Sequence, residues 1–201
     1  MIVHRVFGGA LAAAMLVVAA PAPAQQYSDG YTFLKAIKDR DATKATQLVS
    51  EPGTTVVNSK ERSTGDGALH IVTRDRDYGW LSFLIGKRAR LDLQNLQGVT
   101  ALSIASQLGW LEGADLLLQY GATPDIGNNR GETPLILAVQ LRNLPMVRLL
   151  LAKGANPKKS DRAAGLSAVD YASRDGARSA AILKLLQAPP PPAKKVAGPK
   201  L

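Results

Sequence analysis

The fold of this chain is decided by a stretch that it contains twice. One copy reads Asn128-Asn-Arg-Gly131-Glu-Thr133-Pro134-Leu135-Ile-Leu-Ala138, and Leu149-Leu-Leu151-Ala-Lys-Gly154-Ala155-Asn156 follows it. The other reads Asn95-Leu-Gln-Gly98-Val-Thr100-Ala-Leu102-Ser-Ile-Ala105, with Leu116-Leu-Leu118-Gln-Tyr-Gly121-Ala122 behind it. Every shared residue recurs at the same interval, and a fixed period of about 33 residues is typical of proteins built from stacked repeats. Such a stack offers an extended surface for binding another molecule, not a pocket built around one reaction.

Each unit has the pattern of two short helices joined by a turn. Apolar residues recur at helical spacing in two runs, which in the clearest unit lie within 135–139 and 146–151. Thr133 is expected to cap the first helix, and Pro134 suits its first position, where a missing N–H costs nothing. Gly154 is expected to end the second helix, because glycine accepts the left-handed conformation found there. The unit is therefore predicted to be helix, turn, helix and protruding loop.

Weaker copies extend the repeat in both directions. Residues 65–85 keep the glycine and several apolar positions of 98–118, and more degraded copies occupy 33–49 and 165–186. The sequence therefore predicts an all-α solenoid of about five helix-turn-helix repeats over residues 25–187, with the strongest pattern at 95–157. Small residues recur where neighbouring units must approach closely, at Ala105, Ala138 and Ala172. Stability should then reside in the interfaces between repeats.

The two ends of the chain differ from the repeats. A basic start, an uncharged run from Val6 to Ala20 and an Ala-Pro-Ala site are typical of a signal peptide, 1–24, cut after Ala24. The apolar run falls short of the ~20 residues that span a bilayer. Residues 188–201 are rich in proline and lysine and are expected to form a flexible tail. We expect a periplasmic bacterial protein without a membrane span after cleavage; secretion into the medium is the alternative.

Composition removes several classes of chemistry. The chain has no cysteine, which excludes disulfides, thiolate metal sites and thiol nucleophiles. Its formal net charge of +9 favours anionic partners by long-range attraction, although the same charge also serves solubility. No feature points to nucleic acid.

The run from Asn129 to Ala138, the segment from Val147 to Asn156 and the period of the repeat together resemble the ankyrin repeat. The resemblance implies antiparallel helix pairs stacked into a curved solenoid, with loops at right angles to the helices. It also implies a protein that binds other proteins and is not an enzyme in its repeats. Departures exist: the Thr-Pro-Leu motif survives only at Thr133, and Arg142 stands where a glycine usually bends the chain between the helices.

Residues that could carry out chemistry are few. His70 is the only histidine after the predicted cleavage site, so neither a histidine metal site nor a hydrolytic triad is supported. It stands at the family's helix-start position, where a hydrogen-bonded structural role is usual. Gly65-Asp-Gly67 lacks the Lys-Ser/Thr of a phosphate loop. Trp80 and Trp110 are expected to pack near the turns between helices. We predict no catalytic residue, cofactor or metal, and an enzyme would need His70 or a carboxylate pair in a cleft.

Candidate binding residues are the positions that the repeat itself leaves unconstrained. They lie at the loop tips and at the ends of the first helix of each unit, where apolar residues stand beside arginine, as in protein-contact surfaces. The loop-tip candidates are Asp66, Leu96, Gln97, Val99, Asn129, Arg130 and Glu132. The helix-end candidates are Arg74, Gln107, Leu108, Gln140, Leu141 and Arg174. Ordinary variation at unconstrained sites explains the same pattern equally well.

The leading hypothesis is a non-enzymatic scaffold that holds a periplasmic protein through its loop tips and concave helix face. The alternative is a cationic module that binds an anionic polymer of the envelope. The sequence does not name the partner.

Overall fold

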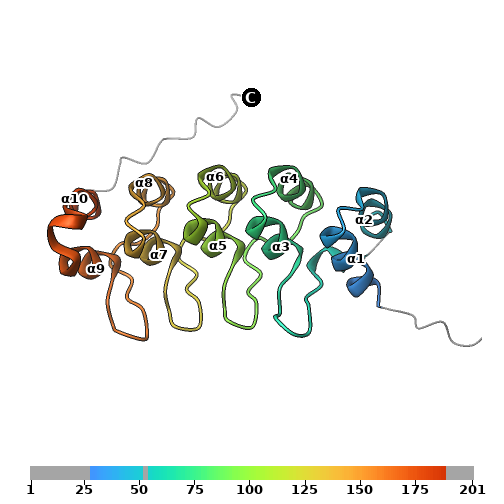
Figure 1. Cartoon of the computed structure of the whole chain (residues 1–201), viewed down its shortest axis with the longest axis horizontal. Helices are drawn as coiled ribbons and strands as arrows, with labels where there is room; N and C mark the ends of the chain where they lie inside the picture. The colour runs from blue at the N-terminus through green and yellow to red at the C-terminus, as the bar shows by residue number, and fades with distance from the viewer. Residues whose placement is uncertain (1–27, 52–53, 189–201) are drawn as a thin grey trace, which may run out of the picture.

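The computed structural model describes residues 28–51 and 54–188, and in these segments the chain is a row of five helix pairs (Figure 1). The first helix of each pair lies in an inner row, and the second lies in an outer row. The inner helices are α1 (Asp29–Lys38), α3 (Ala68–Arg74), α5 (Ala101–Leu108), α7 (Pro134–Gln140) and α9 (Ala168–Asp175). The outer helices are α2 (Ala42–Val49), α4 (Tyr78–Gly86), α6 (Leu111–Gln119), α8 (Leu144–Ala152) and α10 (Ala180–Gln187). Short 3-10 helices, η1 (Val56–Asn58) and η2 (Gly176–Ser179), lie between them.

Local sequence signals place the helix ends as predicted. The Thr133 hydroxyl accepts a hydrogen bond from the Ile136 N–H, and Pro134 is the first residue of α7. Beyond α8, Gly154 has a φ of +88°, the left-handed conformation expected at this position. The fourth unit therefore begins and ends where the local sequence predicts. Thr133 satisfies a free N–H group at the start of α7, and Gly154 permits the change of chain direction after α8.

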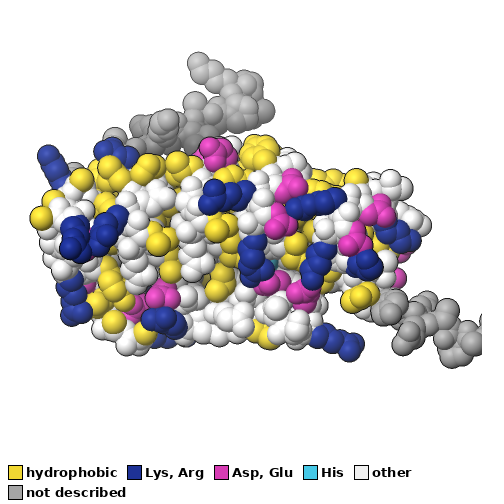
Figure 2. Space-filling view, viewed as in Figure 1, with side chains coloured by type: hydrophobic (Ala, Val, Ile, Leu, Met, Phe, Trp, Pro, Cys, Tyr) yellow, Lys and Arg dark blue, Asp and Glu magenta, His cyan; other side chains and the backbone are white. Residues whose placement is uncertain are grey.

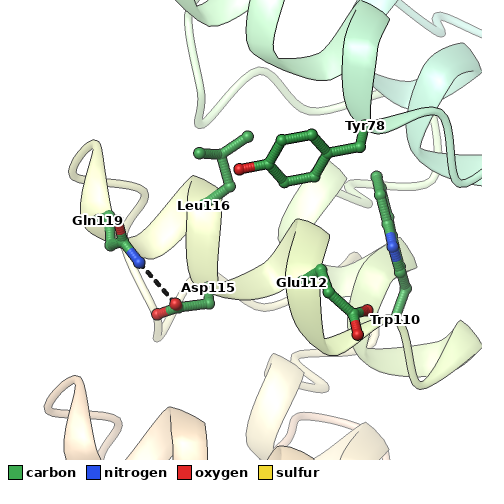
Figure 3. Close-up of a pocket in the computed structure, with 6 residues that line it drawn as sticks. All are labelled: Tyr78, Trp110, Glu112, Asp115, Leu116 and Gln119. Atoms are coloured by element: carbon green, nitrogen blue, oxygen red, sulfur yellow. Dashed lines mark hydrogen bonds between the residues drawn. The ribbon is translucent and has the colours of Figure 1, made fainter.

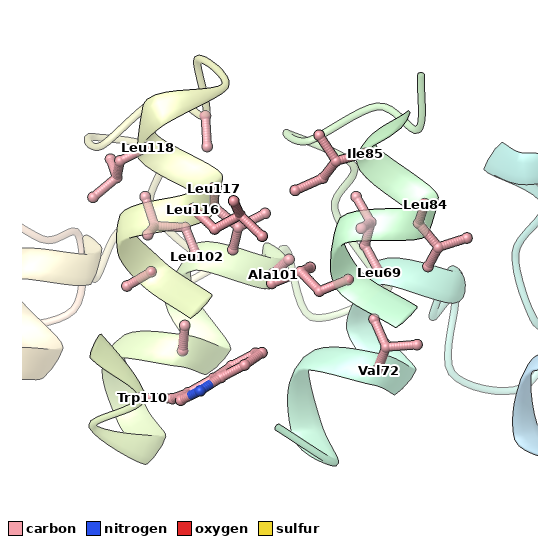
Figure 4. Packing of buried hydrophobic residues seen from close by; sticks show 14 of the residues in the cluster. Leu69, Val72, Leu84, Ile85, Ala101, Leu102, Trp110, Leu116, Leu117 and Leu118 are labelled. Atoms are coloured by element: carbon pink, nitrogen blue, oxygen red, sulfur yellow. The ribbon is translucent and has the colours of Figure 1, made fainter. Parts of the chain in front are cut away.

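The core runs between the pairs. Ala105, Ala138 and Ala172 have no exposed surface, which confirms that small residues lie where neighbouring inner helices meet. Leucines of the outer helices, such as Leu117 and Leu150, are equally buried. Figure 4 shows side chains of α3 and α4 packing against those of α5 and α6 in one continuous apolar layer. Since each pair shields its neighbour, removing one pair would expose two apolar faces.

The turn between the two helices of a pair always contains a residue with positive φ. Glycine fills this position in the third and fifth pairs, whereas arginine fills it in the others: Arg40, Arg76 and Arg142, with φ of 61°, 53° and 53°. Each arginine reaches the next pair, where Arg40 donates to Asp75, Arg76 to the Leu108 carbonyl and Arg142 to Asp175. The left-handed backbone is unfavourable for arginine, but here it aims the side chain at the neighbouring repeat.

Arg142 makes the strongest of these contacts. Its Nε and one terminal nitrogen each lie 2.7 Å from a different carboxylate oxygen of Asp175. The hydrogen bonds from Arg142, followed by one from Ser179, hold the pKa of Asp175 well below its ordinary value. The position that lacks the family's glycine therefore joins the fourth pair to the fifth.

Four loops project from the inner row on the side away from the outer helices (Figure 1), and we call them fingers: 60–67, 94–100, 127–133 and 160–167. One backbone hydrogen bond joins each of the second, third and fourth fingers to the finger before it. These bonds run from Leu96 N–H to Thr64 O, from Asn129 N–H to Gln97 O and from Arg162 N–H to Arg130 O, at 3.0, 2.9 and 2.7 Å. The fingers therefore form a ladder that fixes the spacing of their tips.

Two predicted segments lie outside the part of the chain that the structure describes. The signal peptide, 1–24, falls within residues 1–27, and all but Ala188 of the tail predicted at 188–201 falls within 189–201. Within 28–51 and 54–188, no helix is long and apolar enough to cross a membrane.

Candidate protein-binding surface

The structure separates the predicted binding residues by exposure. Those with exposed side chains are Arg74, Leu96, Gln97, Gln107, Asn129, Arg130, Gln140, Leu141 and Arg174. Val99 and Leu108 are half-buried, and Leu108 packs against the apolar core. Asp66 and Glu132 are buried.

Two of the exposed residues are large and apolar. Leu96 lies on the second finger with 59% of its surface exposed, and Leu141 follows α7 with 56% exposed. The backbone at both positions is held: Leu96 N–H donates to the Thr64 carbonyl, and Leu141 N–H donates to the Leu137 carbonyl. An apolar side chain exposed on a fixed backbone can be covered by a partner at little cost in backbone entropy.

Asp66 is not free for a partner, contrary to the prediction. Its carboxylate accepts two hydrogen bonds from Arg74, at 2.5 and 3.1 Å, and one from the Asn95 side-chain amide at 2.8 Å. Burial opposes ionisation of this carboxyl, but the hydrogen bonds from Arg74 and Asn95 outweigh it and hold its pKa below the ordinary value. Asp66 therefore ties the first finger to α3 and to the second finger, and it engages both terminal nitrogens of Arg74.

Glu132 is also corrected. It is 7% exposed, and its carboxylate accepts a hydrogen bond from the Asn128 side-chain amide at 2.8 Å. Arg130 lies 3.6 Å from the other carboxylate oxygen and is itself well exposed. Glu132 holds the third finger from inside, and Arg130 is the exposed charged side chain of this finger.

His70 has the structural role expected of it. The imidazole is fully buried; its Nδ1 accepts from the Gly67 N–H at 3.0 Å, and its Nε2 lies 2.9 Å from the Val99 carbonyl. This pattern requires the neutral tautomer with the proton on Nε2. Burial lowers the pKa of His70, which favours the same neutral form. The ring joins the start of α3 to the second finger and leaves no nitrogen for a substrate or metal.

Sequence reasoning missed a cavity of about 950 Å³ at the first pair. One wall is a face of α1 that includes Tyr31, Leu34, Lys35 and Lys38, and the other is the rising arm of the first finger, 59–63. The two walls meet closely, because a Cβ atom on Gly30 would lie 2.5 Å from the Ser59 hydroxyl. The repeat pattern could not predict this cavity, because the cavity lies beside α1, where the pattern is most degraded.

A smaller hollow of about 470 Å³ lies on the outer helices (Figure 3). Tyr78, the first residue of α4, and Trp110, at the start of α6, stand on one side of it, and Asp115 and Gln119 of α6 stand on the other. Trp110 is 8% exposed and lies on the backbone of α6, where Gly113 leaves room for the ring. The packing role predicted for Trp110 is confirmed. This hollow is separate from the fingers.

Comparison with models of protein families identifies the family to which the repeats belong. A model described as ankyrin repeats (3 copies) matches residues 69–161 and again residues 121–189. The chain belongs to the ankyrin-repeat family. The matched segments begin inside α3 and continue past α10, so the ankyrin repeats include four of the five helix pairs seen in the structure. A search of curated proteins finds no match.

Proposed function

We propose that this ankyrin-repeat protein is a non-enzymatic scaffold that binds a partner protein through its finger tips and the exposed ends of its inner helices. The observation that carries the proposal is the pair of exposed leucines, Leu96 and Leu141, held on rigid backbone among polar side chains such as Gln97, Gln140 and Arg130. Apolar residues surrounded by polar groups are the usual composition of a protein-binding patch. Ankyrin repeats are generally protein-interaction modules, which supports the same conclusion.

The proposed place of action is the bacterial periplasm. The support is the sequence of residues 1–24, with its basic start, apolar run and small-residue cleavage site. Fusion of residues 1–27 to a reporter enzyme that is active only after export tests this directly, with N-terminal sequencing of the product to locate the cut. A reporter retained in the cytoplasm contradicts the proposed location without touching the binding surface.

The binding proposal is tested by site-specific crosslinking in intact cells. A photoreactive amino acid placed at Leu96 or Leu141 should form a crosslink to one partner, and the same group at Tyr120 should not, because Tyr120 is 64% exposed but follows the outer helix α6. With the purified partner, Leu96→Asp and Leu141→Asp should each weaken binding at least tenfold, whereas Tyr120→Asp leaves it unchanged. Equal losses in all three variants would contradict the proposed surface.

A second candidate function, binding of an anionic polymer, is favoured by the distribution of charge. Residues 28–141 contain 12 basic and 13 acidic residues, a net charge of −1, whereas residues 142–188 contain 9 basic and 3 acidic residues, a net charge of +6. Within the described segments, seven exposed basic residues of the last two repeats have no ion pair: Arg148, Lys158, Lys159, Arg162, Arg174, Arg178 and Lys184. Figure 2 shows Lys and Arg gathered at the end that carries α9 and α10.

The two candidates differ in how binding responds to salt. Attraction of a polymer to the basic end weakens steeply as ionic strength rises, because exposed charges are screened beyond a Debye length of ~8 Å at physiological salt. Binding through Leu96 and Leu141 should change little. Affinity that falls with salt and survives both leucine substitutions would favour the polymer.

A further inference from the structure

The first helix pair lacks a finger in the part of the chain that the structure describes. Its inner helix α1 has 10 residues, whereas the inner helices of the other pairs have 7 or 8 residues. The additional length lies at the start of α1, because α1 ends at Lys38 just before Arg40, as α7 ends at Gln140 just before Arg142. Ser28 caps this extended start. The first turn of α1 therefore occupies positions that precede the helix in every other repeat.

Within residues 28–51 and 54–188, the ladder of fingers ends at the first finger. The hairpin bond from Glu61 N–H to the Asp66 carbonyl corresponds to the bond from Asn95 N–H to the Val99 carbonyl in the next finger. The residue after Asn95 donates to the preceding finger, so its counterpart in the first finger is Arg62. Within the described segments the Arg62 N–H has no hydrogen-bond acceptor. An exposed donor at the edge of a ladder is a site at which another extended chain can pair.

This end of the ladder faces the cavity of about 950 Å³ beside α1. Tyr31, which is 51% exposed, contributes apolar surface to it, and Ser59 and Ser63 line the finger side. The walls are the helix face of 28–39 and the segment 59–63, in which Lys60 pairs with Gly67 and a turn begins at Arg62. The volume of the cavity and the Arg62 N–H together suit an extended peptide segment that pairs with the edge of the first finger.

The charged side chains around the cavity indicate which kind of peptide segment can bind there. The ammonium groups of Lys35 and Lys38 face the carboxylates of Asp39 and Glu61, one each, which leaves each ammonium with further donors. Lys60 is turned toward the Gln94 carbonyl of the next finger. The Arg62 guanidinium has neither an ion pair nor a hydrogen bond within the described residues. The cavity therefore offers one uncommitted guanidinium beside the uncommitted backbone donor.

We propose that the cavity between α1 and the first finger binds an extended acidic segment of a partner protein. A backbone carbonyl of that segment accepts from the Arg62 N–H, and one of its carboxylates pairs with the Arg62 guanidinium. Apolar residues that alternate with the acidic ones contact the ring of Tyr31 on the α1 wall. The proposal rests on the protein-binding function above and names the partner chemistry at one end of the stack.

A second copy of this chain is the less suitable occupant. The last finger could extend the ladder of another molecule, but the last two repeats carry a net charge of +6 and would approach the cationic rim of the cavity. Like charges facing each other oppose such a contact. An acidic segment lowers the same repulsion.

The experiment uses the purified protein and a fluorescein-labelled peptide of alternating glutamate and valine, with fluorescence anisotropy as the readout. The peptide should bind, and Arg62→Gln should weaken binding about tenfold, the effect of losing one charge-assisted contact. Lys158→Gln removes an equal charge near the last finger and should leave binding unchanged. In NMR hydrogen exchange, the peptide should slow exchange of the Arg62 amide and leave that of Asn129, already bonded to Gln97, unaffected.

Several outcomes would overturn the proposal. A peptide of alternating lysine and valine that binds equally well removes the role of charge, and equal losses in Arg62→Gln and Lys158→Gln remove the role of the cavity. Dextran sulfate that competes with the peptide and shows the same loss in Arg62→Gln would assign the cavity to an anionic polymer. Sedimentation showing self-association that Arg62→Gln abolishes would assign it to a second copy. None of these results depends on Leu96 or Leu141, so the wider binding proposal is tested separately.

Discussion

Acid should destabilise the start of α3, because the buried His70 ring can accept the Gly67 N–H only while it is neutral. Protonation would turn the accepting Nδ1 into a donor that faces the Gly67 N–H at 3.0 Å. Burial lowers the pKa of His70 below its ordinary 6.5; Asp66 nearby acts in the opposite direction, and Arg74 and Lys60 lower it further. In the unfolded chain the imidazole keeps its ordinary pKa. As pH falls, the unfolded state therefore binds the proton first.

The sign and size of the effect follow from this difference. The stability that neutral His70 contributes is present above pH 6.5 and is lost as pH falls below it, by up to ~1.4 kcal/mol per pH unit until the folded pKa is reached. Between pH 7.5 and 5.5 the upper bound of this loss is about 1.4 kcal/mol, set by the unfolded pKa alone. Carboxyls with lowered pKa, such as Asp66, titrate below this range, and His70 is the only histidine in the described segments.

Urea unfolding followed by far-UV circular dichroism, repeated at pH 7.5, 6.5 and 5.5, measures this loss. His70→Gln stays neutral throughout and should show a flat profile over the same range. It should also be less stable at pH 7.5 by about 1–3 kcal/mol, since a buried partner of the imidazole is left without a hydrogen bond. A wild-type profile as flat as that of His70→Gln would refute the reasoning, as would a histidine variant with the wild-type slope.

Three further predictions concern packing and backbone strain. Ser106 and Ser103 lie on α5 without exposed surface, but only the Ser106 hydroxyl lacks a partner, so Ser106→Ala should raise the unfolding free energy by up to ~1 kcal/mol and Ser103→Ala should lower it, as measured by urea titration. A Cβ atom on Gly113 would lie 2.2 Å from the Trp110 ring, so Gly113→Ala should cost about 1–3 kcal/mol and shift tryptophan emission to the red as the ring is displaced; unchanged emission would contradict this. Arg142→Gly should retain a higher melting temperature than Arg142→Ala, because both lose the ion pair but only glycine relieves the φ of +53°, and the opposite order would show that strain is absent.

The regular part of the fold could be predicted because local chemistry and the repeat agree. Thr133, Pro134 and Gly154 define helix ends by rules that need no tertiary information, and the spacing of Ala105 from Ala138 indicates which faces meet. Even Arg142, which departs from the family pattern, was recognisable as the residue in the turn. Its bond to Asp175 was not, because that contact depends on where the next repeat lies.

The surroundings of the candidate binding residues were predicted less well for a related reason. Sequence spacing shows that Asp66 and Glu132 are free to vary, but not that neighbouring side chains turn both carboxylates inward. The cavity beside α1 lies where the described residues form no finger, and a degraded first repeat does not reveal whether its helix begins at Asp29 or later. Arg62 was overlooked because its significance comes from the neighbour that it lacks.

The stacking of pairs implies that distant parts of this molecule act independently. Substantial contacts between helices join only members of one pair or of adjacent pairs, as α5 contacts α3, α6 and α7. A ligand beside α1 can therefore affect a site at α9 only through the pairs that lie between them, one interface at a time. Two ligands should bind with additive free energies, and any gain from a partner long enough to occupy both sites would come from tethering alone.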